Sequence, residues 1–563
     1  MKHLLTTLLT TLTITTALAQ NYRWAHGFGG PNSNTEGTSI ATDAQANVYV
    51  IGSFGDNIDF DPGPGVAILN MQSFSPGIFV AKYDSAGIYQ WAFSLNGYNG
   101  YASHLAVNAT GLYITGCFNG TTDFDPSPAV ANLTASSADI FLAKYDFSGS
   151  YQWAINIGAD NVCIAEDIAI DDNGNSYITG FIRDTVDFDP GAGIAMPIPN
   201  TLEDIYFAKY DSNGNYVWAK TLGNPATFFM VECMTVDPTG LIISGKFSDT
   251  LDVDPSAGVY NLDATTGKEV YISKYDLNGN FIWAGNIGGS SGETIYSIAS
   301  DLSGNGNFYI TGGGSDTVDF DLTTGNYNVN CGTGRFCFAK YNLLGNLLFV
   351  KIAGSGGGNG RSMVVDTNEN IYIIGLFAGI VDFDPGIDTA NLVVTGSGFS
   401  ADIFFAKYDN NGNYVWAKSM GGIYSDWGKA IAIDGIGNQY VTGFFTNSMD
   451  ADPDGGIVTL SPAIAENIFI AKYYESPNAV INHTLTSADI SIYPNPSDNY
   501  IVVNFHSSVK NTQFSVIDVN GREIITGKLN SSLKINVARL PPGVYLLKAK
   551  SQASITCKKF IKK

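Results

Sequence analysis

The chain has 563 residues, a hydrophobic content of 45% and a net charge of −23, a composition that suits a large folded protein. The charge is divided unevenly. Residues 485–563 hold 11 Lys and Arg against 4 Asp and Glu, Lys2 adds one positive charge, and residues 20–484 therefore carry −31. A region that acidic excludes nucleic-acid binding through a phosphate-neutralising surface, whereas cationic groups are its natural electrostatic complement.

Residues 1–19 have the order of a secretory signal peptide. Lys2 and His3 precede a short run of Leu and Thr, and Ala17-Leu18-Ala19 precedes Gln20. A basic start, a short apolar stretch and a small-x-small end predict cleavage after Ala19. The run is too short to span a membrane, and no other segment has 18 consecutive apolar residues. We therefore expect an exported protein without a membrane span.

Between residues 20 and 474, two motifs recur with the same period. Two independent motifs that keep one period indicate a repeat architecture. The tetrapeptide Asp-Phe-Asp-Pro, or a close variant, begins at positions spaced 63 to 68 residues apart, namely Asp59, Asp123, Asp187, Asp252, Asp319, Asp382 and Asp450. The motif Ala-Lys-Tyr-Asp, or a close variant, places its lysine at Lys82, Lys144, Lys209, Lys274, Lys340, Lys407 and Lys472.

Each repeat unit is predicted to contain four short strands. Residues 403–409 and 414–418 are apolar and aromatic runs joined by an Asn-Gly turn, and residues 430–434 and 439–445 follow a glycine-rich crossing. Such runs between Gly and Asn turns are typical of β-hairpins, and no stretch keeps a helical period of 3.6 residues. We therefore predict an all-β fold, a seven-bladed β-propeller with almost no helix.

The two ends of the repeat array predict how the ring closes. A Tyr-x-Trp-Ala segment, or a variant, follows the lysine motif in the other units, but after Lys472 the chain continues as Glu475-Ser-Pro-Asn. A matching segment occurs at the opposite end of the array, as Tyr22-Arg-Trp-Ala-His26. We expect this strand to complete the last blade as its outer strand, which leaves no open edge between the ends.

The repeats resemble the bacterial β-propeller repeat family, whose blades read Asp-x-Phe-x-Ala-Lys-Tyr-Asp-x-x-Gly-Asn, then Trp, then Gly-Gly. Residues 402–409, Gly412-Asn413, Trp416 and Gly421-Gly422 carry this likeness, which extends over about residues 22–474. The resemblance implies the fold. It implies little about function, because one fold supports many functions.

Several repeated or small residues are expected to have structural roles. Lysines and tryptophans at identical repeat positions are expected to pack between blades. Cys117 is expected to be a small buried apolar residue. Cys331 and Cys337 flank Gly332-Thr-Gly334 and are the candidate pair for a local disulfide, which export would permit.

Both aspartates of each Asp-Phe-Asp-Pro motif are candidate calcium ligands, because calcium prefers carboxylate and carbonyl oxygens. Propeller geometry places this loop on the same face as the glycine-rich crossings, so the acids would form a ring. The alternative is that each aspartate caps its own turn. The candidates are Asp59, Asp61, Asp123, Asp125, Asp187, Asp189, Asp252, Asp254, Asp319, Asp321, Asp382, Asp384, Asp450 and Asp452, with Asp454 as a third carboxylate in the last loop.

Aromatic residues in the crossing loops are the candidate ligand contacts, because loops on a rigid scaffold usually carry function and exposed aromatics suit glycan or protein contacts. The alternative is that they only fill the channel. The set is Tyr98, Tyr101, Phe228, Phe229, Tyr424 and Trp427. No motif places a histidine near a serine or cysteine, so no catalytic triad is predicted.

Residues 475–484 are expected to be a linker, and residues 485–563 a small β-sandwich. This last segment closely resembles the C-terminal sorting domain of the type IX secretion system of Bacteroidetes, through Tyr493-Pro-Asn-Pro496, Asp518-Val-Asn-Gly521, Leu540-Pro-Pro-Gly-Val-Tyr545 and the Lys-rich end. The resemblance implies recognition by the type IX machinery, passage across the outer membrane, removal of this domain, and release or attachment at the cell surface.

Taken together, the sequence predicts a secreted or surface-displayed β-propeller that binds a glycan or protein ligand as a monomer, without catalysis and with calcium as the one candidate cofactor. The first alternative is a polysaccharide-degrading hydrolase or lyase that uses paired carboxylates. The second is a structural spacer in a surface layer.

Overall fold

The computed structural model describes residues 20–30, 35–70, 76–95, 98–158, 163–183, 185–196, 204–223, 229–289, 293–301, 304–354, 356–396, 400–463, 465–475, 490–505, 512–517, 523–529, 532–550 and 555–563. These residues form strands and turns and contain no helix, which confirms the all-β prediction. The chain divides into a propeller unit, Ala17–Ser476, and a second unit that includes Pro477–Lys563. The predicted signal peptide and its cleavage site at Ala19 lie outside the described residues.

The strands of the propeller unit form groups of four that follow one another along the chain. Sheet 1 contains β2 (Glu36–Thr42), β3 (Val48–Phe54), β6 (Gly77–Tyr83) and β7 (Tyr89–Leu95). Sheet 2 contains β8 (Tyr98–Asn108), β9 (Gly111–Asp123), β10 (Asn132–Tyr145) and β11 (Tyr151–Ile157). Sheet 3 contains β12 (Cys163–Ile170), β13 (Ser176–Ile182), β14 (Asp204–Tyr210) and β15 (Tyr216–Leu222). Sheet 4 contains β16 (Phe229–Asp237), β17 (Gly240–Asp252), β18 (Asn261–Tyr275) and β19 (Phe281–Gly289).

The remaining groups complete the array. Sheet 5 contains β20 (Thr294–Ser300), β21 (Phe308–Asp319), β22 (Asn328–Tyr341) and β23 (Leu347–Ala353), and it is linked to sheet 4 by pairing of β19 with β21. Sheet 6 contains β24 (Gly358–Val365), β25 (Ile371–Ala378), β28 (Ala401–Tyr408) and β29 (Tyr414–Met420). Sheet 7 contains β30 (Trp427–Ile433), β31 (Gln439–Thr446), β34 (Glu466–Glu475) and β1 (Gln20–Phe28). Short ladders join β4 (Ile58–Asp59) to β5 (Ile68–Leu69), β26 (Ile380–Asp382) to β27 (Asn391–Val393), and β32 (Met449–Asp450) to β33 (Thr459–Leu460).

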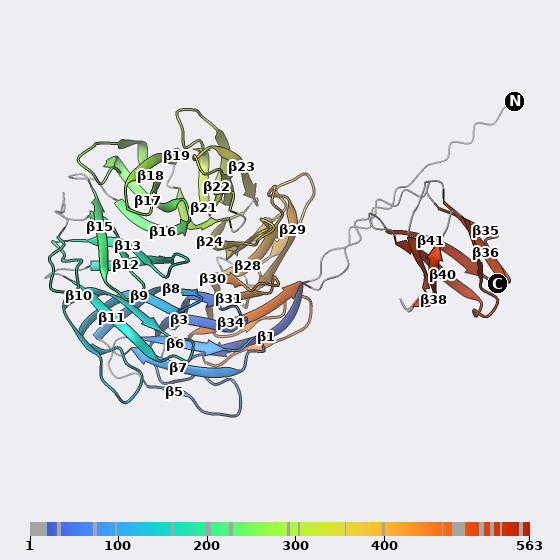
Figure 1. Ribbon diagram of the computed structural model, residues 1–563, viewed down its shortest axis with the longest axis horizontal. Coiled ribbons are helices and arrows are strands. Elements are labelled where there is room, and N and C mark those ends of the chain that lie inside the picture. Colours follow the sequence, from blue (N-terminus) through green and yellow to red (C-terminus); the bar gives the residue numbers. More distant parts are fainter. Residues whose placement is uncertain are drawn as a thin grey trace. The chain divides into compact units, whose positions relative to one another are not determined.

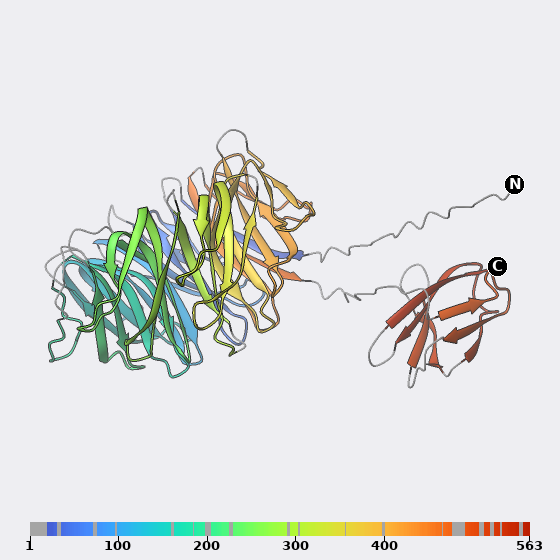
Figure 2. The ribbon, with the colours of Figure 1, turned by 90° about the horizontal axis from the view of Figure 1, so that it is seen from above.

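The first and last strands of the array close the ring, as predicted. β1 pairs antiparallel with β34, and Trp24 lies opposite Lys472. The innermost strand of each sheet packs against that of the next, and β2 contacts both β8 and β30, so the series returns to its start. Figure 1 shows the sheets around a common centre, and Figure 2 shows the same strands from above.

The repeated lysine and tryptophan fasten each sheet to the following one. Lys82 Nζ and Trp91 Nε1 both donate to the Phe147 carbonyl of the next sheet, at 2.7 and 3.3 Å. The Trp91 ring also covers Gly149 (φ +81°), where a Cβ would lie only 3.0 Å from the ring. Lys472 and Trp24 bind the Ser85 carbonyl in the same way across the closure. These contacts confirm that the repeated side chains pack between blades.

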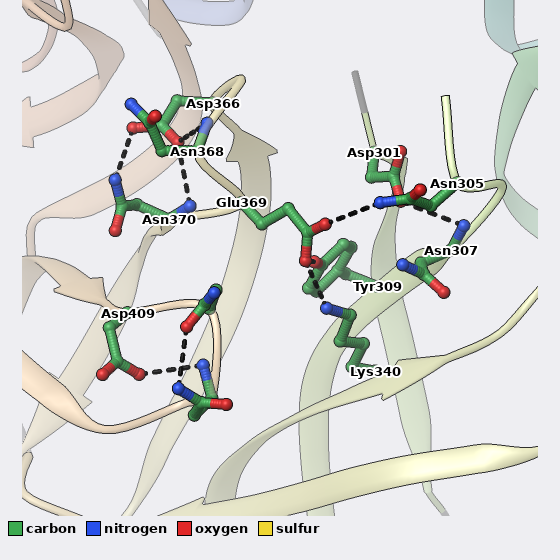
Figure 3. Close-up of polar contacts among 12 residues, drawn as sticks. Asp301, Asn305, Asn307, Tyr309, Lys340, Asp366, Asn368, Glu369, Asn370 and Asp409 are labelled. Carbon is green, nitrogen blue, oxygen red and sulfur yellow. Dashed lines mark hydrogen bonds and ion pairs between the residues drawn. The ribbon is translucent and has the colours of Figure 1, made fainter. Parts of the chain in front are cut away.

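One lysine makes a different contact between sheets, which Figure 3 shows. Lys340 Nζ lies 2.5 Å from Glu369 Oε2, and the same carboxyl group binds Asn305 and Tyr309. Glu369 has φ +62°, a left-handed conformation that costs a residue with a side chain about 1 kcal/mol or more. The inter-sheet contacts hold it in this conformation.

The second unit consists of two small sheets, as expected for a β-sandwich. One sheet has the order β35 (Ile490–Tyr493), β36 (Tyr500–Phe505) and β39 (Ser532–Asn536), and the other has the order β38 (Glu523–Leu529), β37 (Thr512–Ile517), β40 (Gly543–Lys550) and β41 (Ile555–Lys562). Ile501 and Val503 of the first sheet share a buried core with Val516 and Leu547 of the second. Asn495 Oδ1 accepts a hydrogen bond from Ile561 N, which ties the Tyr-Pro-Asn-Pro motif to the last strand.

Candidate binding site on the innermost strands

The Asp-Phe-Asp-Pro aspartates organise their own loops through backbone hydrogen bonds. In sheet 1, Asp59 Oδ1 accepts from Asp61 N and Ala67 N at 3.1 and 2.7 Å, and Asp61 Oδ1 accepts from Gly63 N at 2.8 Å. The tyrosine of the lysine motif also holds this loop, because Tyr83 OH donates to the Phe60 carbonyl. The same pattern recurs at Asp123, Asp187, Asp252, Asp319, Asp382 and Asp450. This geometry favours turn capping at all of these loops.

The last loop, with its third carboxylate, follows the same rule. Asp452 Oδ1 accepts from Asp454 N at 2.9 Å, while the Asp454 side chain pairs with Lys418 at 2.7 Å. No group of three His, Cys, Asp or Glu side chains within the described ranges is arranged to hold a metal ion. Calcium binding therefore stays a prediction, and the hydrogen bonds favour the capping alternative.

The capped loops and the glycine-rich crossings lie on the same face, as predicted. Gly158, which follows β11, bridges to Asp187 of the next sheet, and Gly421 bridges in the same way to Asp450. Buried carboxylates at the start of the third strands occupy the space beside the crossing glycines. A Cβ at Gly158 would lie 2.2 Å from the Asp139 carboxylate. The crossing glycines are therefore required by close packing.

The predicted ligand-contact residues divide into three groups. Phe229 is only 4% exposed and belongs to the core between sheets 3 and 4, so its assignment as a contact residue was wrong. It lies in β16, where it pairs with Phe247 and faces apolar neighbours. Tyr424 is exposed, and Trp427 begins β30 in a half-buried position. The Tyr98 and Tyr101 side chains and the whole of Phe228 lie outside the described part of the structure.

The predicted disulfide is also corrected. Cys331 and Cys337 are both buried free thiols on β22. Burial raises the pKa of the Cys337 thiol and the nearby Cys331 adds to this shift, so the two side chains share one buried cluster without being bonded. Cys117 is buried, as expected, and burial raises the pKa of its thiol to about 12.

The innermost strand of every sheet contains a β-bulge at the same point. In sheet 3 the register with β13 shifts between Ala165 and Asp167, which leaves Glu166 without a partner on β13. The neighbouring strand has Gly180 opposite the bulge, where a Cβ would lie 1.9 Å from the Ile164 carbonyl oxygen. A bulge re-aims side chains and commonly occurs beside functional sites. We call the bulged residues of the seven sheets the bulge ring: Thr38, Ser103, Glu166, Glu232, Tyr296, Arg361 and Lys429.

The side chain after a bulge commonly accepts a hydrogen bond from the innermost strand of the next sheet. Asp167 Oδ2 accepts from Met234 N of the next sheet at 2.7 Å, and Ser297 Oγ accepts in the same way from Met363 N. The bulge ring is thus held by hydrogen bonds between innermost strands. Its side chains are presented on a rigid support, the arrangement that precise binding requires.

Carboxylates and a histidine gather on one part of the bulge ring. Burial raises the pKa of Glu166 to about 7; the nearby His104 opposes this shift, and Glu232 and Asp167 add to it. His104 Nδ1 lies 2.9 Å from Asp167 Oδ1. Burial lowers the pKa of His104, but the nearby Asp167 and Glu166 together outweigh this effect and raise it above its ordinary value. Glu232 lies 3.7 Å from Lys246 Nζ, and burial also raises its pKa.

Cations and aromatic rings occupy the adjoining part. The Arg361 guanidinium lies 4.0 Å from the centre of the Tyr296 ring and 5.1 Å from that of Trp427. Lys429 Nζ lies 3.0 Å from Glu36 Oε2 and 5.6 Å from the Trp427 ring. Around the ring, two acids are therefore followed by a tyrosine, two cations and two hydroxyl residues.

Motif reasoning missed the bulge ring. His104 and Arg361 fall at different points of the repeat motifs, and nothing in the sequence pairs them with residues more than 60 positions away. One signal was present: the residue immediately before a small or polar position in each innermost segment varies from Thr to Glu to Arg, while the flanking apolar pattern is kept. Only the register of the strands shows that these variable residues share one ring.

Comparisons with known proteins agree with the two-part organisation. The family model described as "Secretion system C-terminal sorting domain" matches residues 491–563, and the one described as "Beta-propeller repeat" matches residues 23–53. An uncharacterized WD repeat-containing protein of Acanthamoeba polyphaga mimivirus is 26% identical over 473 residues, which are 69% of this chain and 33% of that protein. The chain thus spans about a third of the length of this relative.

Two solved structures from Bacteroides thetaiotaomicron are similar at low scores. The extracellular domain of a putative hybrid two component system matches with a TM-score of 0.16 and 11% identity, over 96% of this chain and 99% of that one. A structural genomics protein of unknown function matches with a TM-score of 0.26 and 11% identity, over 79% and 99%. Scores this low do not establish a shared fold.

In the part of the chain that the structure describes, no helix is long and apolar enough to cross a membrane. The repeat match, the all-β structure and the C-terminal match confirm the family resemblances seen in the sequence. The chain therefore combines an all-β propeller unit, with a β-propeller repeat match at residues 23–53, and a C-terminal segment matched by the sorting-domain family, and it is a secreted or cell-surface protein.

Proposed function

We propose that this protein is a secreted or surface-held binding module, and that the bulge ring receives its ligand. The observation that carries the proposal is chemical variety at one repeated position. The bulged residue is Thr, Ser, Glu, Glu, Tyr, Arg or Lys, while the lysine and tryptophan clasps between sheets are largely uniform. Repeat positions with a structural role keep their residue type. The bulge ring varies in residue type while the contacts that support it do not, and this favours a role of the ring in binding a ligand.

The energetic cost of these side chains points the same way. Burial raises the pKa of both Glu166 and Glu232. Burying a carboxylate is unfavourable unless it is paired. Glu232 has Lys246 at 3.7 Å, so the cost falls mainly on Glu166. A sheet that needed only to pack would carry an apolar or hydroxyl residue here, as sheets 1 and 2 do with Thr38 and Ser103. A buried carboxylate that costs stability and adds nothing to the packing is commonly found at a binding site.

A binding screen with matched variants tests this proposal. The purified full chain is applied to a glycan array and to a set of surface proteins, and compared with Arg361→Met and Glu166→Gln. Arg23→Met is the control, because Arg23 also lies over an aromatic ring, that of Tyr474, but on the outer strand β1. We expect ligands that the wild type and the control retain and that the ring variants lose. Equal binding by all four proteins would refute the proposal.

Hydrolysis of a glycan is the second candidate function, and one observation favours it. Glu166 has a pKa of about 7 and lies near a second acid, Glu232, and an acid of that pKa can hold and transfer a proton at neutral pH. The carboxylate pair expected for such chemistry is then this one, since the loop aspartates are engaged as caps. Release of new reducing ends by the wild type, and not by Glu166→Gln, would identify a hydrolase.

A further inference from the structure

We infer that the bulge ring binds a carboxylated sugar of an acidic glycan, and that Arg361 receives the carboxylate. This inference rests on the function proposed above and specifies its ligand. Arg361 is the fourth residue of β24, where the bulge between Gly360 and Ser362 turns it out of the strand pairing. It lies between the rings of Tyr296 from sheet 5 and Trp427 from sheet 7.

The guanidinium of Arg361 makes no ion pair with any residue that the structure describes. Its Nε is buried and has no hydrogen-bond partner among them. The neighbouring cations differ, because Lys429 pairs with Glu36 and Lys246 with Glu232. A buried donor without a partner costs about 1–3 kcal/mol. The nearby Glu232 carboxylate, whose pKa Arg361 lowers, pairs with Lys246 instead. We therefore expect a closer partner for Arg361 to come from a ligand.

The two aromatic rings prepare Arg361 for a carboxylate. The rings of Tyr296 and Trp427, 4.0 and 5.1 Å from the guanidinium carbon, attract the positive charge of Arg361 and leave its terminal N–H groups as donors for a ligand. These groups match the two oxygens of a carboxylate in a bidentate pair. Because the rings already hold the arginine, little side-chain entropy is lost on binding.

The other members of the ring suit the hydroxyl groups of a sugar. Glu232, on the sheet next to that of Tyr296, and Glu166, on the sheet before it, supply acceptor oxygens, and carboxylates accept hydrogen bonds from hydroxyl donors. The half-buried Trp427, with the exposed Tyr424 three residues before it, adds aromatic surface at the start of β30. A ligand with one anionic group and several hydroxyl groups therefore matches the order of residues around the ring.

The overall charge sharpens the prediction. A domain this acidic repels anions at a distance, so a carboxylated glycan binds only through a short-range pair with a specific cation. The preference for carboxylated over uncharged sugars should then depend on Arg361 itself. A lysine at this position would keep the charge but lose the planar, bidentate geometry.

The test uses matched pairs of oligosaccharides. Oligogalacturonate, oligoalginate and a glucuronate-containing oligosaccharide are each titrated into the full chain by calorimetry, beside their methyl-esterified, uncharged forms. We expect at least one acid form to bind about tenfold or more tighter than its ester, the worth of a charge-assisted hydrogen bond. Arg361→Met should abolish that preference, Arg361→Lys should retain part of it, and Arg23→Met should leave it unchanged.

Three results would overturn the inference. These results are equal binding of esters and acids, no binding of any acid, and a preference for the acid that Arg361→Met retains. The array experiment separates these results from failure of the proposed function. If a neutral glycan or a protein or peptide ligand binds there and depends on Arg361 or Glu166, the function stands and the carboxylated-sugar inference falls. If nothing depends on the ring, both fall. Circular dichroism of each variant confirms that the β-structure is intact.

Discussion

A buried glutamate at the crossing between sheets 4 and 5 should make the stability of the propeller depend on pH. The Glu293 side chain is only 2% exposed. Burial raises the pKa of its carboxyl group from 4.5 to about 7, and the nearby Glu269 carboxylate adds to this shift. The folded state therefore holds the proton more tightly than the unfolded chain. Glu293 imposes almost no penalty below about pH 4.5; the penalty grows between about pH 4.5 and 7 and is complete above that range.

The shift sets the size of the effect. A rise from 4.5 to about 7, at about 1.4 kcal/mol per pKa unit, corresponds to about 3 kcal/mol of lost stability at pH 8. Glu293→Gln keeps the shape of the side chain and removes the charge. The variant should match the wild type at pH 4.5 and exceed it by about 3 kcal/mol at pH 8. For a unit the size of Ala17–Ser476, that is about 3 °C in Tm.

Thermal melts of both proteins from pH 4.5 to 8, in buffers of equal ionic strength, measure the effect. The difference between the two curves is the relevant quantity, because Glu166 and Asp426, whose pKa values are also raised to about 7, change both curves alike. Asp172→Asn is the control, since this carboxylate is exposed. A difference that stays constant with pH would refute the reasoning and show that Glu293 is not held in an environment that disfavours its charge.

Three further predictions concern the motif tyrosines, the loops and export. Tyr210→Phe removes the hydroxyl that donates to the buried Phe188 carbonyl and should lower the free energy of unfolding by about 1–3 kcal/mol in urea titration; an unchanged midpoint would contradict a stabilising role of this hydrogen bond. Asp452→Asn, which weakens the cap on Asp454 N, should lower Tm equally with and without millimolar calcium. A calcium-dependent rise in the wild type alone would instead show a metal site. Mass spectrometry of the secreted protein should find Gln20 first and no peptides from the sorting domain, and an intact C-terminus would contradict removal of that domain.

The repeat architecture followed from the sequence because each unit carries its own local signals. Asn-Gly turns, alternating apolar runs and a period of 63 to 68 residues are properties of neighbouring residues, and hairpins form from neighbouring residues. Closure was predictable for the same reason. The Lys472 unit lacks an outer strand, the segment at Trp24 has no unit of its own, and the pairing of β1 with β34 joins them.

The roles of individual side chains depended on where the strands put them. Phe229 and Trp427 are both aromatic residues at the end of a crossing, yet one lies in the core and the other beside Arg361. Their place along an innermost strand decides this, because successive residues of a strand point to opposite faces. A shift of one residue at a bulge reverses that choice. The turn signals of the sequence do not show such shifts.

The bulge ring is the part that only the tertiary structure decided. Its members come from seven segments, each separated from the next by more than 60 residues, and they share no motif because their side chains differ. They become neighbours because the innermost strands pack around one centre and every strand bulges at the same height. The sequence alone determined a closed β-propeller with a sorting domain. Closure of the chain into a ring then placed Arg361 between rings from two other sheets, since distant residues meet only when the whole array has folded.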